Sequence, residues 1–277
     1  MDLHPIAPAT CIVRNTASTR GRTHALQPGR HPLRLLRYGR IILDSDDQPI
    51  TFQTRELETA LVCLRGGATV GVEGETHALD RYDSLYAPRE ASVEIRPERD
   101  GCDLAEIAAP VSCRHPVQVV RFAAVRDDPT LHFETGGTSS RRDLNIMIGK
   151  NVQAGRILAG IAFSEPGNWT SWPPHEHAAM LEEAYLYIDM PAPAFGVQLV
   201  YTDSKEPELA TIVREGDVVV IPQGYHPNVA APGAAINFLW MMAAHREDVD
   251  RQYGVVNVQP EFAALGTGLE QSRAERK

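Results

Sequence analysis

The sequence predicts an all-β protein, and three observations lead to this prediction. Short runs rich in Val, Ile, Leu and Tyr recur at roughly 8–12-residue spacing, which is typical of a β-sandwich or barrel. The 277 residues include 21 Gly and 20 Pro, so turn-forming residues are frequent along the whole chain. Helical periodicity is weak everywhere except in the charged stretch after Glu261.

Each predicted strand is a run of β-branched, aliphatic or aromatic residues bounded by Gly, Pro, Asn or Asp. These residue types favour a pleated sheet because their side chains pack well on its half-buried surface. In chain order the predicted strands are Ala60–Leu64, Val93–Ile95, Val117–Phe122, Ile157–Phe163, Ala184–Ile188, Val197–Tyr201, Val218–Ile221 and Ile236–Met242. No run approaches about 18 uncharged apolar residues, so we expect no membrane-spanning helix.

The charge balance and the cysteines exclude several classes of protein. The chain carries 27 basic and 36 acidic residues, whereas a protein that binds nucleic-acid phosphates normally carries a net positive charge. Its four cysteines form no CxxC pair, and the first residues lack the basic start and apolar run of a secretory signal. We therefore predict a cytoplasmic protein with reduced, mostly buried thiols, which binds neither nucleic acid nor a membrane.

Two segments share the pattern of an aspartate, an apolar strand and a proline: Arg81–Ile95 and Glu215–Val229. Aligning Asp83 with Asp217 places Ser92 opposite His226. This similarity predicts two copies of one β-module, of which only the second has a histidine at this position. We predict an N-terminal module without metal ligands, a connecting segment, a metal-binding module and a tail, at residues 1–130, 131–155, 156–250 and 251–277.

One group of polar residues has the spacing of metal ligands. His175 and His177 are two residues apart, so in an extended strand both side chains point to one face. Glu183 follows six residues after His177, too far along an extended chain to share an ion, so the chain must bend between them. His226 comes from the Pro-Gln-Gly-Tyr-His turn after a later strand.

Three imidazoles and one carboxylate form a ligand set that suits a divalent ion of borderline softness. We expect one such ion, Zn²⁺ or Mn²⁺ in the first place and Fe²⁺ or Ni²⁺ as alternatives. An ion of charge +2 beside one carboxylate leaves a net positive charge, which would attract an anionic substrate.

The motif HxH…E followed by G-D-(x)₄-P-x-G-x-H is similar to the two motifs of the cupin superfamily. Four segments more closely resemble the family of 5-deoxy-glucuronate isomerase and 5-keto-4-deoxyuronate isomerase: PGNWTSWPPHEH (Pro166–His177), LEEAYLY (Leu181–Tyr187), VQLVYTD (Val197–Asp203) and VREGDVVVIPQGYHPNVAAPG (Val213–Gly233). The resemblance implies two cupin domains in tandem, each an antiparallel double-stranded β-helix or jelly roll. It also implies that Glu183 is the carboxylate ligand, whereas its neighbour Glu182 is expected to be solvated or to support the site from outside. Leu199 stands where the family has arginine.

The reaction implied by this resemblance is an aldose–ketose isomerisation, from 5-deoxy-D-glucuronate to 5-dehydro-2-deoxy-D-gluconate in myo-inositol catabolism. Such a reaction needs a group that moves a proton between neighbouring carbons, and Tyr185 and Tyr187 are candidates because they share a strand face with Glu183. Gln198 and Tyr201 are candidates for orienting the sugar.

A basic residue should bind the carboxylate of such a substrate, and three candidates lie in or near the predicted connecting segment: Arg141, Arg142 and Lys150. For each of them a solvated position is the expected one. Two other functions remain open from the residues alone, an Fe(II)-dependent oxygenase and a sugar-binding cupin without catalytic activity. Exposed strands and the family precedent predict a homo-oligomer.

Overall fold

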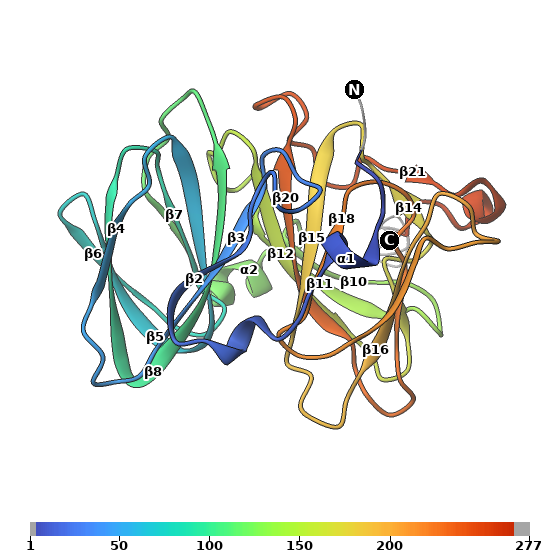
Figure 1. The fold of residues 1–277 in the computed structure, drawn as a ribbon, viewed down its shortest axis with the longest axis horizontal. Coiled ribbons are helices and arrows are strands. Elements are labelled where there is room, and N and C mark those ends of the chain that lie inside the picture. The colour runs from blue at the N-terminus through green and yellow to red at the C-terminus, as the bar shows by residue number, and fades with distance from the viewer. Residues whose placement is uncertain (1–3, 269–277) are drawn as a thin grey trace.

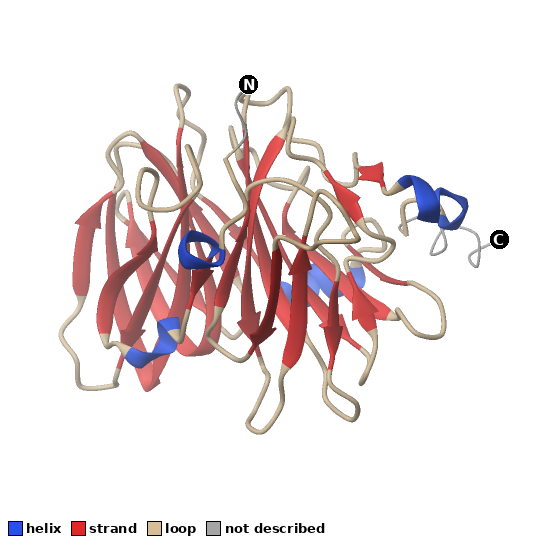
Figure 2. Cartoon of the chain, turned by 45° about the vertical axis from the view of Figure 1, so that its right-hand side comes forward, coloured by secondary structure: helices blue, strands red, loops and turns tan. Residues whose placement is uncertain are grey.

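The computed structural model describes residues 4–268 and is built from two β-barrels that lie side by side (Figure 1). The strands from residue 21 to residue 120 form one barrel, and the strands from residue 132 onwards, together with the short strand at residues 12–13, form the other. Figure 2 shows that short helices occupy only a small part of the chain. They are α1 (Pro8–Cys11), η1 (Thr16–Ser18), α2 (Phe122–Asp127) and η2 (Pro260–Leu265). Within the described residues, no helix is both long and apolar enough to cross a membrane.

The first barrel is an eight-stranded antiparallel sheet that curls around an apolar interior. Its strands are β2 (Gly21–Leu26), β3 (Arg37–Leu43), β4 (Ile50–Gln53), β5 (Leu57–Val72), β6 (Glu75–Leu79), β7 (Ser84–Ala87), β8 (Ser92–Pro110) and β9 (Gln118–Val120). The long strands β5 and β8 pair with each other and change register twice, between Cys63 and Arg65 and between Gly66 and Ala68. Such bulges bend a strand, and the two halves of each strand have different neighbours: β5 pairs with β7 and then β6, and β8 pairs with β4 and then β3.

The second barrel has a seven-stranded sheet in the order β1-β18-β15-β20-β12-β11-β10 and a four-stranded sheet in the order β13-β19-β16-β17. The strands of the larger sheet are β1 (Ile12–Val13), β10 (His132–Thr135), β11 (Arg142–Ile148), β12 (Ile157–Ser164), β15 (Leu181–Ile188), β18 (Val218–Ile221) and β20 (Asn237–Ala244). Those of the smaller sheet are β13 (Trp169–Thr170), β16 (Gly196–Val200), β17 (Leu209–Val213) and β19 (Asn228–Ala230). A short pair is formed by β14 (His175–Glu176) and β21 (Asn257–Val258). Each of the eight predicted strands overlaps an observed one.

The two barrels exchange their first strands. β1 precedes the first barrel in sequence but pairs with β18 of the second, and β9 precedes the second barrel but pairs with β7 of the first. Equivalent aspartates hold both exchanged strands in place. Asp217 accepts hydrogen bonds from the guanidinium of Arg14 (2.7 Å) and the main-chain N–H of Asn15 (3.0 Å). Asp83 accepts the same two kinds of hydrogen bond from Arg121 (2.6 Å) and Phe122 (2.8 Å). These matching contacts support the alignment of Asp83 with Asp217 and the internal repeat.

A second symmetric pair of contacts joins the barrels. Glu182, at the start of β15, is only 5% exposed and accepts three main-chain N–H groups from residues 34, 35 and 36, at 2.7, 2.9 and 2.9 Å. Glu58, at the start of β5, accepts three from residues 155, 156 and 157, at 2.8, 2.7 and 2.8 Å. Of the two roles expected for Glu182, the solvated position is therefore wrong, because the carboxylate anchors the other half of the chain, whereas support of the site from outside stays a prediction. Aligning Glu58 with Glu182 places Thr59 opposite Glu183.

The predicted module limits at residues 130, 155 and 250 stay predictions, but the structure locates the segment expected to be a tail. Residues 251–268 are packed against the second barrel, where β21 pairs with β14 and residues 253–256 line a cavity. The residues from 269 onwards, which belong to the same predicted tail, lie outside the described part of the chain.

Candidate metal centre

Three of the four predicted ligands meet inside the second barrel. Glu183 lies on β15, between β18 and β20, and its side chain is only 1% exposed. Its Oε2 atom lies 3.0 Å from Nε2 of His177 and 3.2 Å from Nε2 of His226. His177 follows β14, and a turn closed by main-chain bonds from residues 180 and 181 to the His177 carbonyl provides the predicted bend. The three ligand atoms lie within 4.8 Å of one another.

The orientation of the His226 ring fits a cation site. Nδ1 of His226 lies 2.9 Å from the carbonyl oxygen of Gly224, and a carbonyl only accepts hydrogen bonds. Nδ1 therefore carries a proton, and Nε2, which faces the Glu183 carboxylate, is the nitrogen that could bind an ion. Nε2 of His226 is buried without a hydrogen-bond partner. An imidazole nitrogen and a carboxylate oxygen that face each other in a buried site are the kind of donor pair that binds zinc-like metals.

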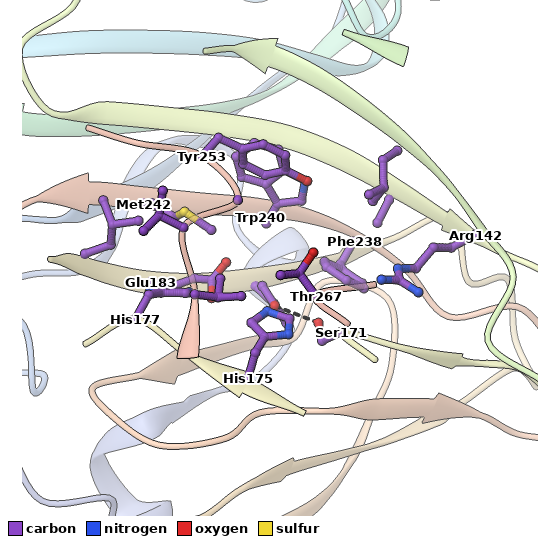
Figure 3. Close-up of a pocket in the computed structure, with 17 residues that line it drawn as sticks. Arg142, Ser171, His175, His177, Glu183, Phe238, Trp240, Met242, Tyr253 and Thr267 are labelled. Carbon is purple, nitrogen blue, oxygen red and sulfur yellow. Dashed lines mark hydrogen bonds and ion pairs between the residues drawn. The ribbon is translucent and has the colours of Figure 1, made fainter. Parts of the chain in front are cut away.

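His175 lies at the edge of the same cluster. Its Nδ1 atom is 2.9 Å from the carbonyl oxygen of Pro173, so Nδ1–H donates there and Nε2 is free to accept or to ligate. Its ring lies 4.9 Å from the ring of His226 and lines the cavity beside the cluster (Figure 3). Burial, followed by the neighbouring histidines, lowers the pKa of His175 to about 3, so the ring is neutral. Its role as the fourth ligand stays a prediction.

The charges in the cluster reinforce one another. Burial alone would raise the pKa of Glu183, but His177 and His226 outweigh it and lower that pKa to about 2. Burial opposes protonation of His177, but Glu183 outweighs burial and raises the pKa of His177 above its usual value. Without a metal the buried pair therefore favours a proton on His177.

This raised pKa predicts a pH dependence of metal binding. A metal ligates only neutral imidazole, so binding must displace the proton from His177. We expect the affinity for Mn²⁺ or Zn²⁺ to fall by about tenfold per pH unit below the pKa of His177, starting at a higher pH than for an ordinary histidine. Titrations against a fluorescent chelator at pH 8, 7 and 6 measure this. An affinity that is constant over this range would contradict proton competition at His177.

Only one of the four predicted catalytic residues lies in the cavity wall. Tyr185 lines the cavity and its hydroxyl lies 2.7 Å from the Ser171 hydroxyl. Tyr187 shares the inner face of β15, as predicted, but its buried hydroxyl donates to Oε1 of Gln198 at 2.5 Å. Gln198 donates from Nε2 to the carbonyl oxygen of His226 at 2.9 Å and is also buried. Tyr187 and Gln198 therefore hold the His226 turn in place and do not line the cavity.

Tyr201 also acts at a distance from the cavity. Its hydroxyl donates to Oε1 of Gln259 at 2.7 Å, and the main-chain N–H of Gln259 donates to the carbonyl oxygen of Pro174 at 2.9 Å. Together with the β14–β21 pair, these bonds fasten residues 253–256 over the cavity, next to His175. The structure thus places Tyr201 as an anchor of the segment that lines the cavity, and Tyr201 is not itself among the lining residues.

Several cavity residues were missed by the sequence analysis. β20 contributes Phe238, Trp240 and Met242, which alternate along the strand and line the cavity together. This period-2 pattern of large side chains was the signal available in the sequence. Tyr253 stacks on Trp240 with ring centroids 4.9 Å apart, as Figure 3 shows. No local pattern indicates Tyr253, because its position depends on the chain returning after β20.

The fold and this site can be compared with known proteins. The model of the KduI/IolB family matches residues 11–262. The chain belongs to the KduI/IolB family. The 5-deoxy-glucuronate isomerase of Geobacillus kaustophilus is 30% identical over 213 residues, which are 71% of this chain and 75% of that protein. The predicted family is thereby confirmed, and so is the expectation that this KduI/IolB protein is an enzyme of the isomerase class.

Solved structures show the fold of this KduI/IolB protein. An IolB-like protein from Salmonella typhimurium LT2 superposes with a TM-score of 0.81 at 23% identity, over 92% of this chain and 98% of that one. A cupin 2 conserved barrel domain protein from Leptotrichia buccalis superposes with a TM-score of 0.50 at 16% identity, over 84% of this chain and 88% of that one. At these identities the likeness concerns the fold alone, and it confirms the predicted all-β cupin fold.

Proposed function

We propose that this chain converts 5-deoxy-D-glucuronate into 5-dehydro-2-deoxy-D-gluconate, an aldose–ketose isomerisation of myo-inositol catabolism. The observation that carries the proposal is the buried cluster of His177, Glu183 and His226 beside a cavity, in a family whose curated members include 5-deoxy-glucuronate isomerases. The reaction moves a proton from the hydroxyl-bearing carbon to the neighbouring aldehyde carbon and the hydroxyl proton to the former aldehyde oxygen, and negative charge develops on the two oxygens between these transfers.

His177, Glu183 and His226 are the residues proposed to hold a divalent ion, with His175 as the fourth ligand. An ion held there would stabilise the negative charge that develops on the substrate oxygens. The donor set suits Zn²⁺ or Mn²⁺, with Fe²⁺ or Ni²⁺ as alternatives. A net positive charge at the cluster would also favour an anionic sugar over a neutral one.

The remaining cavity residues shape the surroundings of the reacting carbons. Burial, followed by the charge of Glu183, raises the pKa of Tyr185 well above its usual value, so its hydroxyl is protonated at neutral pH. Tyr185 is therefore suited to donate a hydrogen bond to a substrate oxygen, as a stabilising group and not as a base. Apolar side chains such as Leu144 and Phe238 line the same cavity and exclude water, which strengthens every electrostatic contact within it.

Proton NMR in D₂O tests the proposed reaction directly. Metal-loaded protein should convert 5-deoxy-D-glucuronate into the ketose, with deuterium entering the carbon next to the new ketone if the proton exchanges with solvent. A chelator should abolish the conversion, and added metal should restore it. Unchanged substrate, in protein confirmed to hold one metal ion per chain, would refute the reaction. Oxygen uptake measured on the same sample would instead support an oxygenase.

A further inference from the structure

Arg142 enters the cavity from β11, on the side away from His177 and Glu183 (Figure 3). Side chains on a strand alternate between its faces, so Arg142 shares its face with Leu144, which also lines the cavity. The partner of Leu144 on β12 is Ala162, another residue of the cavity wall. Arg142 is 4% exposed, so the solvated position expected for it is wrong.

The charge of this guanidinium has no acidic partner among the residues that the structure describes. Arg142 donates from Nη1 to the carbonyl oxygen of Ser140 at 3.0 Å and from Nη2 to that of Trp172 at 2.8 Å. Contacts within residues 4–268 thereby use two of its five N–H groups and leave three for another acceptor. Burial lowers the pKa of Arg142 to about 10, so the side chain still carries its full charge at neutral pH.

The other two basic candidates are differently placed. Arg141, the next residue, is exposed and forms an ion pair with Glu134 at 2.7 Å. Lys150 is exposed in the turn after β11 and is not among the cavity residues. Glu183 is the one carboxylate among the described residues that line the cavity, and its neighbours are the histidines of the cluster. A buried, unpaired charge is costly, and an anionic ligand would remove that cost.

We propose that Arg142 binds the carboxylate of the substrate and thereby selects sugar acids over neutral sugars. The planar guanidinium offers paired N–H donors to a carboxylate, and such charge-assisted contacts are stronger than those between neutral groups. In a linear six-carbon uronate the carbonyl and the carboxylate lie at opposite ends. His177 and Glu183 likewise lie at one end of the cavity and Arg142 at the other (Figure 3). The inference rests on the proposed function for its orientation of the sugar.

The experiment compares two ligands that differ only in the charge at one end, D-glucuronate and D-glucuronamide. Isothermal titration calorimetry on the metal-loaded protein at pH 7.5 gives the ratio of their affinities. The wild type should bind glucuronate about 10- to 100-fold more tightly, the range expected for hydrogen bonds to a charged group. Arg142→Met should bring the ratio close to one, whereas the matched control Arg141→Met should leave it unchanged.

Arg142→Lys keeps the charge but lacks the paired donors, so the ratio of the affinities for glucuronate and glucuronamide should fall severalfold. This variant provides the test if Arg142→Met does not fold. A wild type without preference for glucuronate would overturn the inference, as would a full preference in either Arg142 variant. Turnover of 5-deoxy-D-glucuronate, measured on the same samples, separates the two proposals. If the preference for glucuronate depends on Arg142 but no turnover occurs, the carboxylate site is retained and the isomerase reaction is rejected. If turnover is equal in the wild type and both variants, the isomerase reaction is retained and the carboxylate site is rejected.

Discussion

Replacing His226 by alanine should remove the stoichiometric metal ion and lower kcat/KM by more than about 100-fold. Loss of a group that merely supports a ligand costs up to about 100-fold in metal affinity or activity, so loss of a ligand should cost more. The substitution removes one of the two imidazoles that contact Oε2 of Glu183, and it leaves the carboxylate with His177. Metal content by mass spectrometry and isomerase rates at saturating metal measure the two effects.

The internal repeat supplies a control within the same chain. Ser92 occupies the position equivalent to His226, since Asp83 and Asp217 make matching contacts in the two barrels. Ser92 is exposed at the start of β8, and Ser92→Ala should change neither the metal content nor the rate. Equal losses in His226→Ala and Ser92→Ala would contradict the assignment of the metal site to the second barrel alone. The thermal stability of both variants shows whether either loss reflects unfolding.

The extent to which the fold could be predicted is clearest in three strands. The prediction Val218–Ile221 matches β18 residue for residue, because Gly216 and Asp217 precede it and a proline follows. By contrast, β5 and β8 extend far beyond the predicted Ala60–Leu64 and Val93–Ile95. Gly66 and Gly67 of β5 and Pro97 and Gly101 of β8 are residues that normally end a strand, but they lie at or beside a register shift that bends both strands without ending them.

The site was predictable where its residues belong to a local motif. His177, Glu183 and His226 come from two motifs with characteristic spacing, and the structure brings them together. Away from this cluster, the cavity is lined by β11, β20 and the segment after residue 250. These three segments are far apart in sequence, and only the complete strand topology brings them together. Tyr187 was a candidate because it shares a strand face with Glu183, and Gln198 and Tyr201 were candidates for orienting the sugar, but the sequence does not show which partners the fold gives them. Their hydroxyl and amide groups are instead bonded within the protein.

The contacts of Glu182 had no sequence signal, because its partners are main-chain groups from the other half of the chain. The motif Leu-Glu-Glu shows two adjacent acids, and alternation along the strand sends them to opposite faces. On one face Glu183 lies against His177 and His226, and on the other face Glu182 binds residues 34–36 from the first half of the chain. The same strand therefore positions Glu183 and ties the two barrels together, so the geometry of the site depends on the contact between them.

Replacing Glu182 by alanine should destabilise the protein by about 3–5 kcal/mol, because three main-chain N–H groups lose their acceptor in a buried environment. Urea unfolding, followed by circular dichroism, measures the free energy, and the unfolding midpoint should fall accordingly. Glu182→Gln retains one acceptor oxygen but introduces an amide donor against the N–H groups, so its effect should be intermediate. Glu206→Ala, at an exposed position, should remain within about 0.5 kcal/mol of the wild type.

A separate measurement distinguishes this anchoring role from a direct role in catalysis. If Glu182 acts only through the contact between the barrels, Glu182→Ala should still bind metal at temperatures well below its unfolding midpoint. Its activity should then be lost on warming together with the folded state, and at a lower temperature than in the wild type. A variant of unchanged stability that lacks metal would instead place Glu182 in the metal site. That result would conflict with the bonds of its carboxylate to residues 34–36, on the face of β15 away from Glu183.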